Sequence, residues 1–337
     1  MTSSRISTQA LIDELVRSTG ASDAEAAIRL KAKELISLWV STFGDATMPI
    51  SVDGLASLCG IGRSEEPPLF SPDAELIPDG TGGVTMRVNP DRPETRQRFS
   101  VAHEISHTFF PNYSSKPWCR TDARYRDRHN PEDRLEMLCD IGAAELLFPQ
   151  PWFSRDAVGV INASGLTGLA ATYHASREAT LRRFVEASTD SLAAVFFSWK
   201  LKPTQKGTVG SKDQSNFLGI TAEDELREAL RLRIEYAIVS DSFKAEGYFL
   251  PKDKSVESEG PIFDAASTGE PADGECHLDL GQAAGTYRIW AVPLFTADDQ
   301  LGVGGANTVA ALLRPLDVRR PRRKTGSGND PKLFAEC

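Results

Sequence analysis

Apolar residues recur every three to four positions in the first forty residues, which is the period of an amphipathic helix. Residues 8–18 and 22–40 show it, and Ser22 and Asp23 stand where the second helix would begin. One stripe of that helix is formed by Ile28, Leu35, Leu38 and Trp39. We expect this stripe to pack in the core.

The same period marks two further helices. Residues 98–107 place Phe99, Ala102 and Ile105 at core-facing spacings, so this helix should be buried. Residues 132–149 read as a helix closed by Pro149. Its apolar face includes Leu135, Leu138, Ile141 and Leu146.

Alternation with a period of two predicts strands. Residues 84–88 alternate between Gly82-Gly83 and Asn89-Pro90, and residues 191–199 read as a buried strand. Residues 63–78 are rich in turn-forming and polar types, which predicts a surface loop.

The second half of the chain mixes both patterns. We expect a charged helix over residues 223–236 and strands around residues 287–295 and 308–313. Loops rich in glycine and acidic residues separate them, as in a mixed α/β sensor-like module.

Residues 166–173 and 177–185 form a helix-turn-helix pattern, with Ser176 as the expected N-cap of its second helix. Arg177, Arg182 and Arg183 could contact phosphates. The rival interpretation, a helical wedge packed on the preceding domain, explains the pattern equally well.

The strongest chemical signal is His103-Glu104-Ile105-Ser106-His107, an H-E-x-x-H motif in the buried helix. Residues four apart share a helix face, so His103 and His107 can direct their imidazoles at one metal ion. Glu104 is placed to act as a general base without being a ligand. The alternative is a pair of hydrogen-bonded core histidines.

Glu136 and Asp140 lie four apart on the next helix and share a face. They would serve as a third zinc ligand and as a carboxylate that orients a ligand histidine. Taken alone they could be a solvated acidic edge. The spacing of Cys139 indicates packing beside this site and not ligation.

Two segments carry a family resemblance: R-F-S-V-A-H-E-I-S-H, and E-M-L-C-D-I-G-A-A-E-L-L-F-P. With residues 48–61, which are similar to a short N-terminal helix, they resemble the ImmA/IrrE metallo-endopeptidases over roughly residues 45–190. The resemblance implies a zinc ion bound by His103, His107 and Glu136, with Asp140 in an outer position by the wider gluzincin pattern. It also implies one substrate class: a helix-turn-helix transcriptional repressor, cut once in response to stress or a phage-related signal.

The resemblance suggests roles for other segments. In gluzincin-like peptidases the sheet edge beside the active helix pairs with the substrate, so residues 84–88 could be that edge or an ordinary core strand. Residues 116–128 carry five basic residues against two acidic ones and could contact the substrate. Candidates for stabilising an oxyanion are Tyr125, His129 and His174.

The expected fold class is therefore α+β: a mostly helical zinc-peptidase domain with a small sheet, a helix-turn-helix-like element and a C-terminal mixed α/β domain, which could be GAF-like. The expected boundaries are 1–150, 151–188, 189–316 and a basic flexible tail over 317–337.

Composition bears on nucleic-acid binding and on cellular location. A net charge of −9 argues against avid nonspecific binding of nucleic acid by the whole chain. Five scattered cysteines without C-x-x-C, no apolar run of membrane-spanning length, and acidic residues near the N-terminus favour a cytoplasmic protein.

The predicted function is a zinc-dependent endopeptidase, with manganese as a possible substitute. Two other functions stay open: a non-catalytic metal-binding transcriptional regulator, which could bind DNA directly, and one component of a toxin–antitoxin pair.

Overall fold

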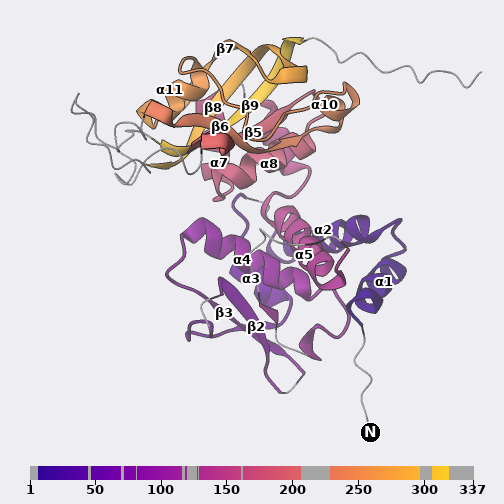
Figure 1. The fold of residues 1–337 in the computed structure, drawn as a ribbon. Helices are drawn as coiled ribbons and strands as arrows, with labels where there is room; N and C mark the ends of the chain where they lie inside the picture. The colour runs from indigo at the N-terminus through magenta and orange to yellow at the C-terminus, as the bar shows by residue number, and fades with distance from the viewer. Residues whose placement is uncertain are drawn as a thin grey trace, which may run out of the picture. The chain divides into compact units, whose positions relative to one another are not determined.

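In the computed structural model, the chain forms two compact units, Met1–Ala187 and Ser188–Cys337 (Figure 1). Each unit has a hydrophobic core of its own. The structure describes residues 7–44, 47–69, 72–80, 82–115, 118–119, 127, 129–160, 162–205, 228–296 and 306–318. Within these ranges no helix has the length and apolar character needed to cross a membrane.

Helices dominate the first unit. They are α1 (Thr8–Thr19), α2 (Ala24–Phe43), α3 (Val52–Leu58), α4 (Glu94–His107), α5 (Pro131–Leu147), α6 (Trp152–Val158), α7 (Ala163–Thr172) and α8 (Arg177–Ala187), with a 3-10 turn η1 at Tyr113–Ser115. Asp23 caps α2 by accepting a hydrogen bond from the backbone N–H of Ala26 at 2.8 Å. Of the stripe predicted on α2, Ile28 and Leu35 are buried and Trp39 packs partly buried against the core, whereas Leu38 is exposed.

A small sheet accompanies these helices, and its strands β1 (Ile61–Arg63), β2 (Ala74–Pro78), β3 (Val84–Val88) and β4 (Trp118–Cys119) lie in the order β1-β3-β2-β4. β3 pairs in parallel with β1 and antiparallel with β2. Both edges of β3 are therefore occupied, and the hypothesis that residues 84–88 form a free edge for substrate is wrong. The other interpretation, a core strand, is the one that the structure supports.

The surface loop predicted for residues 63–78 is wrong at its end, because residues 74–78 form β2. Ala74 and Leu76 are buried, and β2 pairs with both β3 and β4. The prolines and acidic residues in and beside this segment are typical of a loop, but the segment pairs with β3, which follows it directly in the chain, and with the more distant β4.

Two short helices end the first unit. α7 and α8 match the predicted pair, and Ser176 caps α8 by accepting a hydrogen bond from the backbone N–H of Ala179 at 3.1 Å. The rings of Phe148, Phe153 and Tyr173 contact one another edge-on or tilted, with centroids 5.2 to 5.6 Å apart. This aromatic cluster joins α6 and the end of α7 to the residue that follows α5.

The second unit is built on a five-stranded antiparallel sheet in the order β6-β5-β9-β8-β7. The strands are β5 (Ala193–Lys200), β6 (Arg231–Val239), β7 (Ala272–Leu278), β8 (Gly285–Thr296) and β9 (Ala306–Val318); the helices are α10 (Asp241–Ala245) and α11 (Pro261–Thr268), with 3-10 turns η3 (Pro203–Gln205) and η4 (Gly281–Ala283). The predicted strands at 191–199, 287–295 and 308–313 correspond to β5, β8 and β9. The α+β class is confirmed.

The charged helix predicted for residues 223–236 is wrong over its second half, where β6 begins at Arg231; residues 223–227 lie outside the described ranges. Leu232 and Ile234 alternate with charged residues and pair with β5. Arg233 is buried and donates hydrogen bonds to the carbonyls of Lys200 and Asp253. Pairing with the neighbouring strand β5, and not local propensity, determines that this segment is a strand.

Candidate metal centre

The H-E-x-x-H residues lie on the last turns of α4, where His103, Glu104 and His107 are all completely buried. The two imidazole rings share one face of the helix, with centroids 5.1 Å apart and planes at 73°. Burying three polar side chains is costly unless partners satisfy them. For the two histidines, the neighbouring helix α5 supplies such partners.

α5 can approach α4 closely because it carries a glycine at the contact. A Cβ atom at Gly142 would lie 2.5 Å from Ser106 Oγ and 2.9 Å from Ser106 Cβ, closer than such atoms pack. Ser106 lies between the two histidines in sequence, one residue before His107. The absence of a side chain at position 142 therefore sets the spacing of the two helices at the site.

Glu136 contacts Nε2 of both histidine rings. His103 Nε2 is 3.2 Å from Glu136 Oε2, and His107 Nε2 is 3.5 Å from Glu136 Oε1. The Glu136 side chain is only 14% exposed. Two imidazoles from α4 and one carboxylate from α5 thus converge on a common point.

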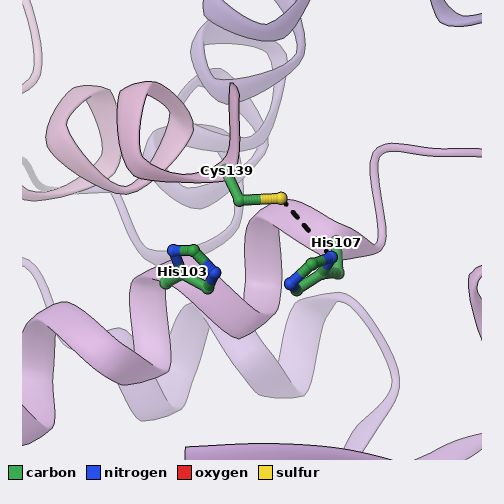
Figure 2. Close-up of side chains that lie close together, drawn as sticks. All are labelled: His103, His107 and Cys139. Carbon is green, nitrogen blue, oxygen red and sulfur yellow. Dashed lines mark hydrogen bonds between the residues drawn. The ribbon is translucent and has the colours of Figure 1, made fainter. Parts of the chain in front are cut away.

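The other nitrogen of each ring contacts the next turn of α5. His103 Nδ1 is 2.9 Å from Asp140 Oδ1, and His107 Nδ1 is 3.4 Å from Cys139 Sγ. Figure 2 shows Cys139 reaching one nitrogen of His107 while the second nitrogen points toward His103. Adjacent residues of α5 therefore hold the outer sides of the two rings.

These carboxylates change the acidity of His103. Burial alone would lower its pKa, but hydrogen bonds with Asp140 and Glu136 and their charges raise the pKa from 6.5 to about 9. The cluster attracts positive charge strongly enough to hold a proton on a fully buried ring. A divalent cation would satisfy the same need.

The distances fit a cation. Zinc binds nitrogen and oxygen at about 2.0 to 2.2 Å, so two ligand atoms of a tetrahedral site lie about 3.3 Å apart. Both measured separations between the histidines and Glu136 agree with this value. His103, His107 and Cys139 also have ligand atoms within 4.8 Å of one another, which is looser than a tetrahedral site requires. The donor groups present therefore fit a divalent metal: the two imidazoles, with the Glu136 carboxylate or the Cys139 sulfur beside them.

None of the three residues predicted to stabilise an oxyanion is placed at the site by the described part of the structure. Tyr125, with most of the basic segment 116–128, lies outside the described residues. His129 is exposed just before α5. His174 Nε2 lies 3.3 Å from Glu94 Oε2, at the start of α4 and about 13 Å along its axis from His103. That distance removes His174 from the site.

Arg183 is not available to contact phosphates, as the helix-turn-helix hypothesis proposed. It is buried and makes a bidentate ion pair with Glu145 of α5, at 2.8 and 2.7 Å, and it also donates to the carbonyl of Phe148. Arg29 of α2 pairs with the same carboxylate. The sequence showed three arginines on one short helix but not which of them faced inward.

In comparisons with known proteins, one family model matches part of the chain. Residues 74–185, which span α4 and α5, match the model of a peptidase family described as the IrrE N-terminal-like domain. No curated protein matches the chain. Among solved structures a Mycobacterium tuberculosis transcriptional regulator is similar at 12% identity, over 91% of this chain and 80% of that chain, with a TM-score of 0.49. A likeness this weak says nothing about function.

Proposed function

We propose, from the match of residues 74–185 to the IrrE N-terminal-like domain family of peptidases, that the protein is a zinc-dependent endopeptidase. It makes a site-specific cut in a helix-turn-helix transcriptional repressor and so relieves repression of stress- or phage-related genes. His103, His107 and Glu136 hold the metal, and Glu104 is the catalytic residue. Asp140 is a positioning residue. The reaction takes place in the cytoplasm.

One observation carries the proposal: Nε2 of both histidines faces the same carboxylate at 3.2 and 3.5 Å. Two core histidines kept only for packing would not need a shared carboxylate from a second helix. The spacing is that of ligand atoms around one small cation. Two imidazoles and one carboxylate suit zinc, and manganese could replace it.

The chemistry divides between the metal and the chain. When bound, the cation supplies Lewis-acid chemistry, which polarises the scissile carbonyl and makes water more acidic. Glu104, next to His103 on α4, accepts the proton from the attacking water and passes it to the leaving amine. Asp140 accepts a hydrogen bond from Nδ1–H of His103 at 2.9 Å, which fixes the tautomer that leaves Nε2 free to bind. Burial of α4 excludes bulk water from these groups.

The test uses the purified full chain and the repressor encoded by the gene next to its own. With zinc or manganese present, the repressor should be cut at one position, and a chelator should stop the reaction. Glu104→Gln should abolish cleavage while metal binding is retained, because the base is lost and the ligands remain. Glu94→Gln, an exposed position on the same helix, should cleave like the unaltered protein. Cleavage by Glu104→Gln would refute the assigned role.

The same experiment separates the two alternatives. A non-catalytic metal-binding regulator would bind metal and a specific operator but leave every neighbouring repressor intact. A component of a toxin–antitoxin pair would be encoded beside a small antitoxin that neutralises a toxic activity. The burial of Arg183 removes one of the phosphate contacts on which direct DNA binding depended.

A further inference from the structure

The imidazole rings of His103 and His107 make corresponding contacts with α5. Each histidine directs Nε2 at Glu136, and each directs Nδ1 at a residue of the same turn of α5. For His103 that residue is Asp140, and for His107 it is Cys139. We propose that Cys139 is a positioning residue, whose sulfur accepts a hydrogen bond from Nδ1–H of His107 and so directs Nε2 of that ring at the metal. This inference rests on the proposed metal centre and assigns a role to a side chain that the mechanism does not use.

The contact has the geometry of a hydrogen bond to sulfur. Cys139 Sγ lies 3.4 Å from His107 Nδ1, and both side chains are fully buried. When Nε2 offers its lone pair to a cation, Nδ1 of a neutral imidazole must carry the hydrogen. That hydrogen then points at the sulfur. Sulfur is the weaker acceptor, so His107 is held less firmly than His103, which has a carboxylate at 2.9 Å.

A ligand role for Cys139 would require a different site. If Cys139 Sγ and His107 Nδ1 shared the cation, Nε2 of His107 could not bind it as well, because the two nitrogens lie on different sides of the ring. Glu136 lies on the Nε2 side of both rings, and Nδ1 of His103 already contacts Asp140. A site built on Cys139 Sγ and His107 Nδ1 would therefore leave Nε2 of His107, and Glu136 beside it, out of the coordination. The arrangement in the structure favours the outer role.

The position of Cys139 changes the charge of the metal centre. A thiol at this position leaves the inner ligands as two nitrogens and one oxygen, whereas a ligating thiolate would add negative charge to the centre. Outer-sphere partners of ligand histidines contribute to metal affinity, and losing one typically costs 10- to 100-fold. Because sulfur is a weak acceptor, the expected loss lies at the lower end of that range.

The first experiment is the absorption spectrum of the full chain loaded with cobalt(II) in the absence of substrate. A thiolate bound to cobalt gives intense charge-transfer absorption in the near ultraviolet, and a thiol in the outer position gives none. We expect visible ligand-field bands without that absorption. A near-ultraviolet charge-transfer band that disappears in Cys139→Ala would show that Cys139 is a ligand and would overturn the proposal.

The second experiment measures zinc affinity by competition with a chelator. Cys139→Ala should raise the dissociation constant about 10-fold. Cys139→Ser, which keeps an acceptor, should recover most of the loss. Cys276→Ala, a cysteine of the second unit, should bind like the unaltered protein.

Equal affinity for Cys139→Ala and the unaltered protein would reduce Cys139 to packing and refute the inference. If the alanine variant does not fold, the serine variant and the cobalt spectrum still decide it. Neither readout involves peptide cleavage. A failure of the proposed enzymatic function would therefore leave this test intact, and the reverse also holds.

Discussion

His103 is the residue at which the electrostatics of the site can be measured without any metal. Burial would lower its pKa, but Asp140 and Glu136 raise it to about 9, above the 6.5 of an unfolded chain. A raised folded-state pKa means that protonation of His103 stabilises the fold. This stabilisation is complete below about pH 6.5 and is lost as the pH rises through about 9.

The metal-free protein should therefore lose stability between pH 6.5 and 9, by up to roughly 3 kcal/mol from this one group. Chemical unfolding at several pH values measures the loss. Asp140→Asn should flatten the profile, because it removes one of the charges that raise the pKa, while His129→Ala, at an exposed position, should leave it unchanged. An unaltered pH profile in Asp140→Asn would contradict this account of His103.

At this scale the sequence predicted which residues of each helix share a face. Periodicity alone placed His103 with His107, and Glu136 with Asp140, because residues four apart share a helix face. It did not predict which atoms meet. The contact of Cys139 with His107, and the inward direction of Arg183, depend on the rotation of α5 and α8 about their axes, which tertiary packing sets.

Among the elements, the pair α4 and α5 determines whether the site can form. Their close approach depends on Gly142, since a Cβ there would lie 2.5 Å from Ser106 Oγ. Gly142→Ala should push the helices apart and move Glu136 and Asp140 away from the histidines. We expect zinc affinity to fall about 10-fold or more, as for the loss of an outer-sphere partner.

Zinc competition measures this, and Gly168→Ala is the matched control. Gly168 lies in α7 with nothing within 4 Å of an added Cβ, so alanine should be neutral or slightly stabilising there. Equal zinc affinity in Gly142→Ala and the unaltered chain would show that the helix contact does not set the site.

The helices were predicted better than the strands. α1, α2, α4 and α5 each carry an apolar period, α2 and α5 also carry a local start or stop signal, and all four appear within a few residues of the predicted ranges. β2 and the start of β6 were assigned to a loop and a helix. β2 pairs with the adjacent strand β3 and with the distant β4, and the start of β6 pairs with β5, so strand pairing and not local periodicity decides both segments.

On the scale of the whole molecule, every proposed metal ligand lies in the unit Met1–Ala187. That unit has its own core, so we expect the fragment 1–187 to fold and to bind zinc like the full chain. A fragment ending at residue 150 should be unstable. It leaves the largely buried Glu145 without Arg183 and removes Phe153 and Tyr173 from the ring of Phe148.

Removing one partner of a buried ion pair costs about 3–5 kcal/mol. Circular dichroism and zinc titration of the two fragments measure the difference. Equal stability and affinity would show that α6, α7 and α8 are not needed by the site. The structure places these helices in one unit with α4 and α5, whereas the sequence suggested a separate boundary at residue 150; the domain boundaries and the GAF-like character of the second unit stay predictions.

The central claim is that His103, His107 and Glu136 hold one cation together, and the zinc content of Glu136→Gln tests it most directly. The unaltered protein should bind one zinc per chain, and the variant should lose it at the same free zinc concentration, because an amide is a poor substitute for a carboxylate ligand. Glu132→Gln, an exposed position at the start of the same helix, should retain the metal. Zinc bound by Glu136→Gln with undiminished affinity would contradict the account.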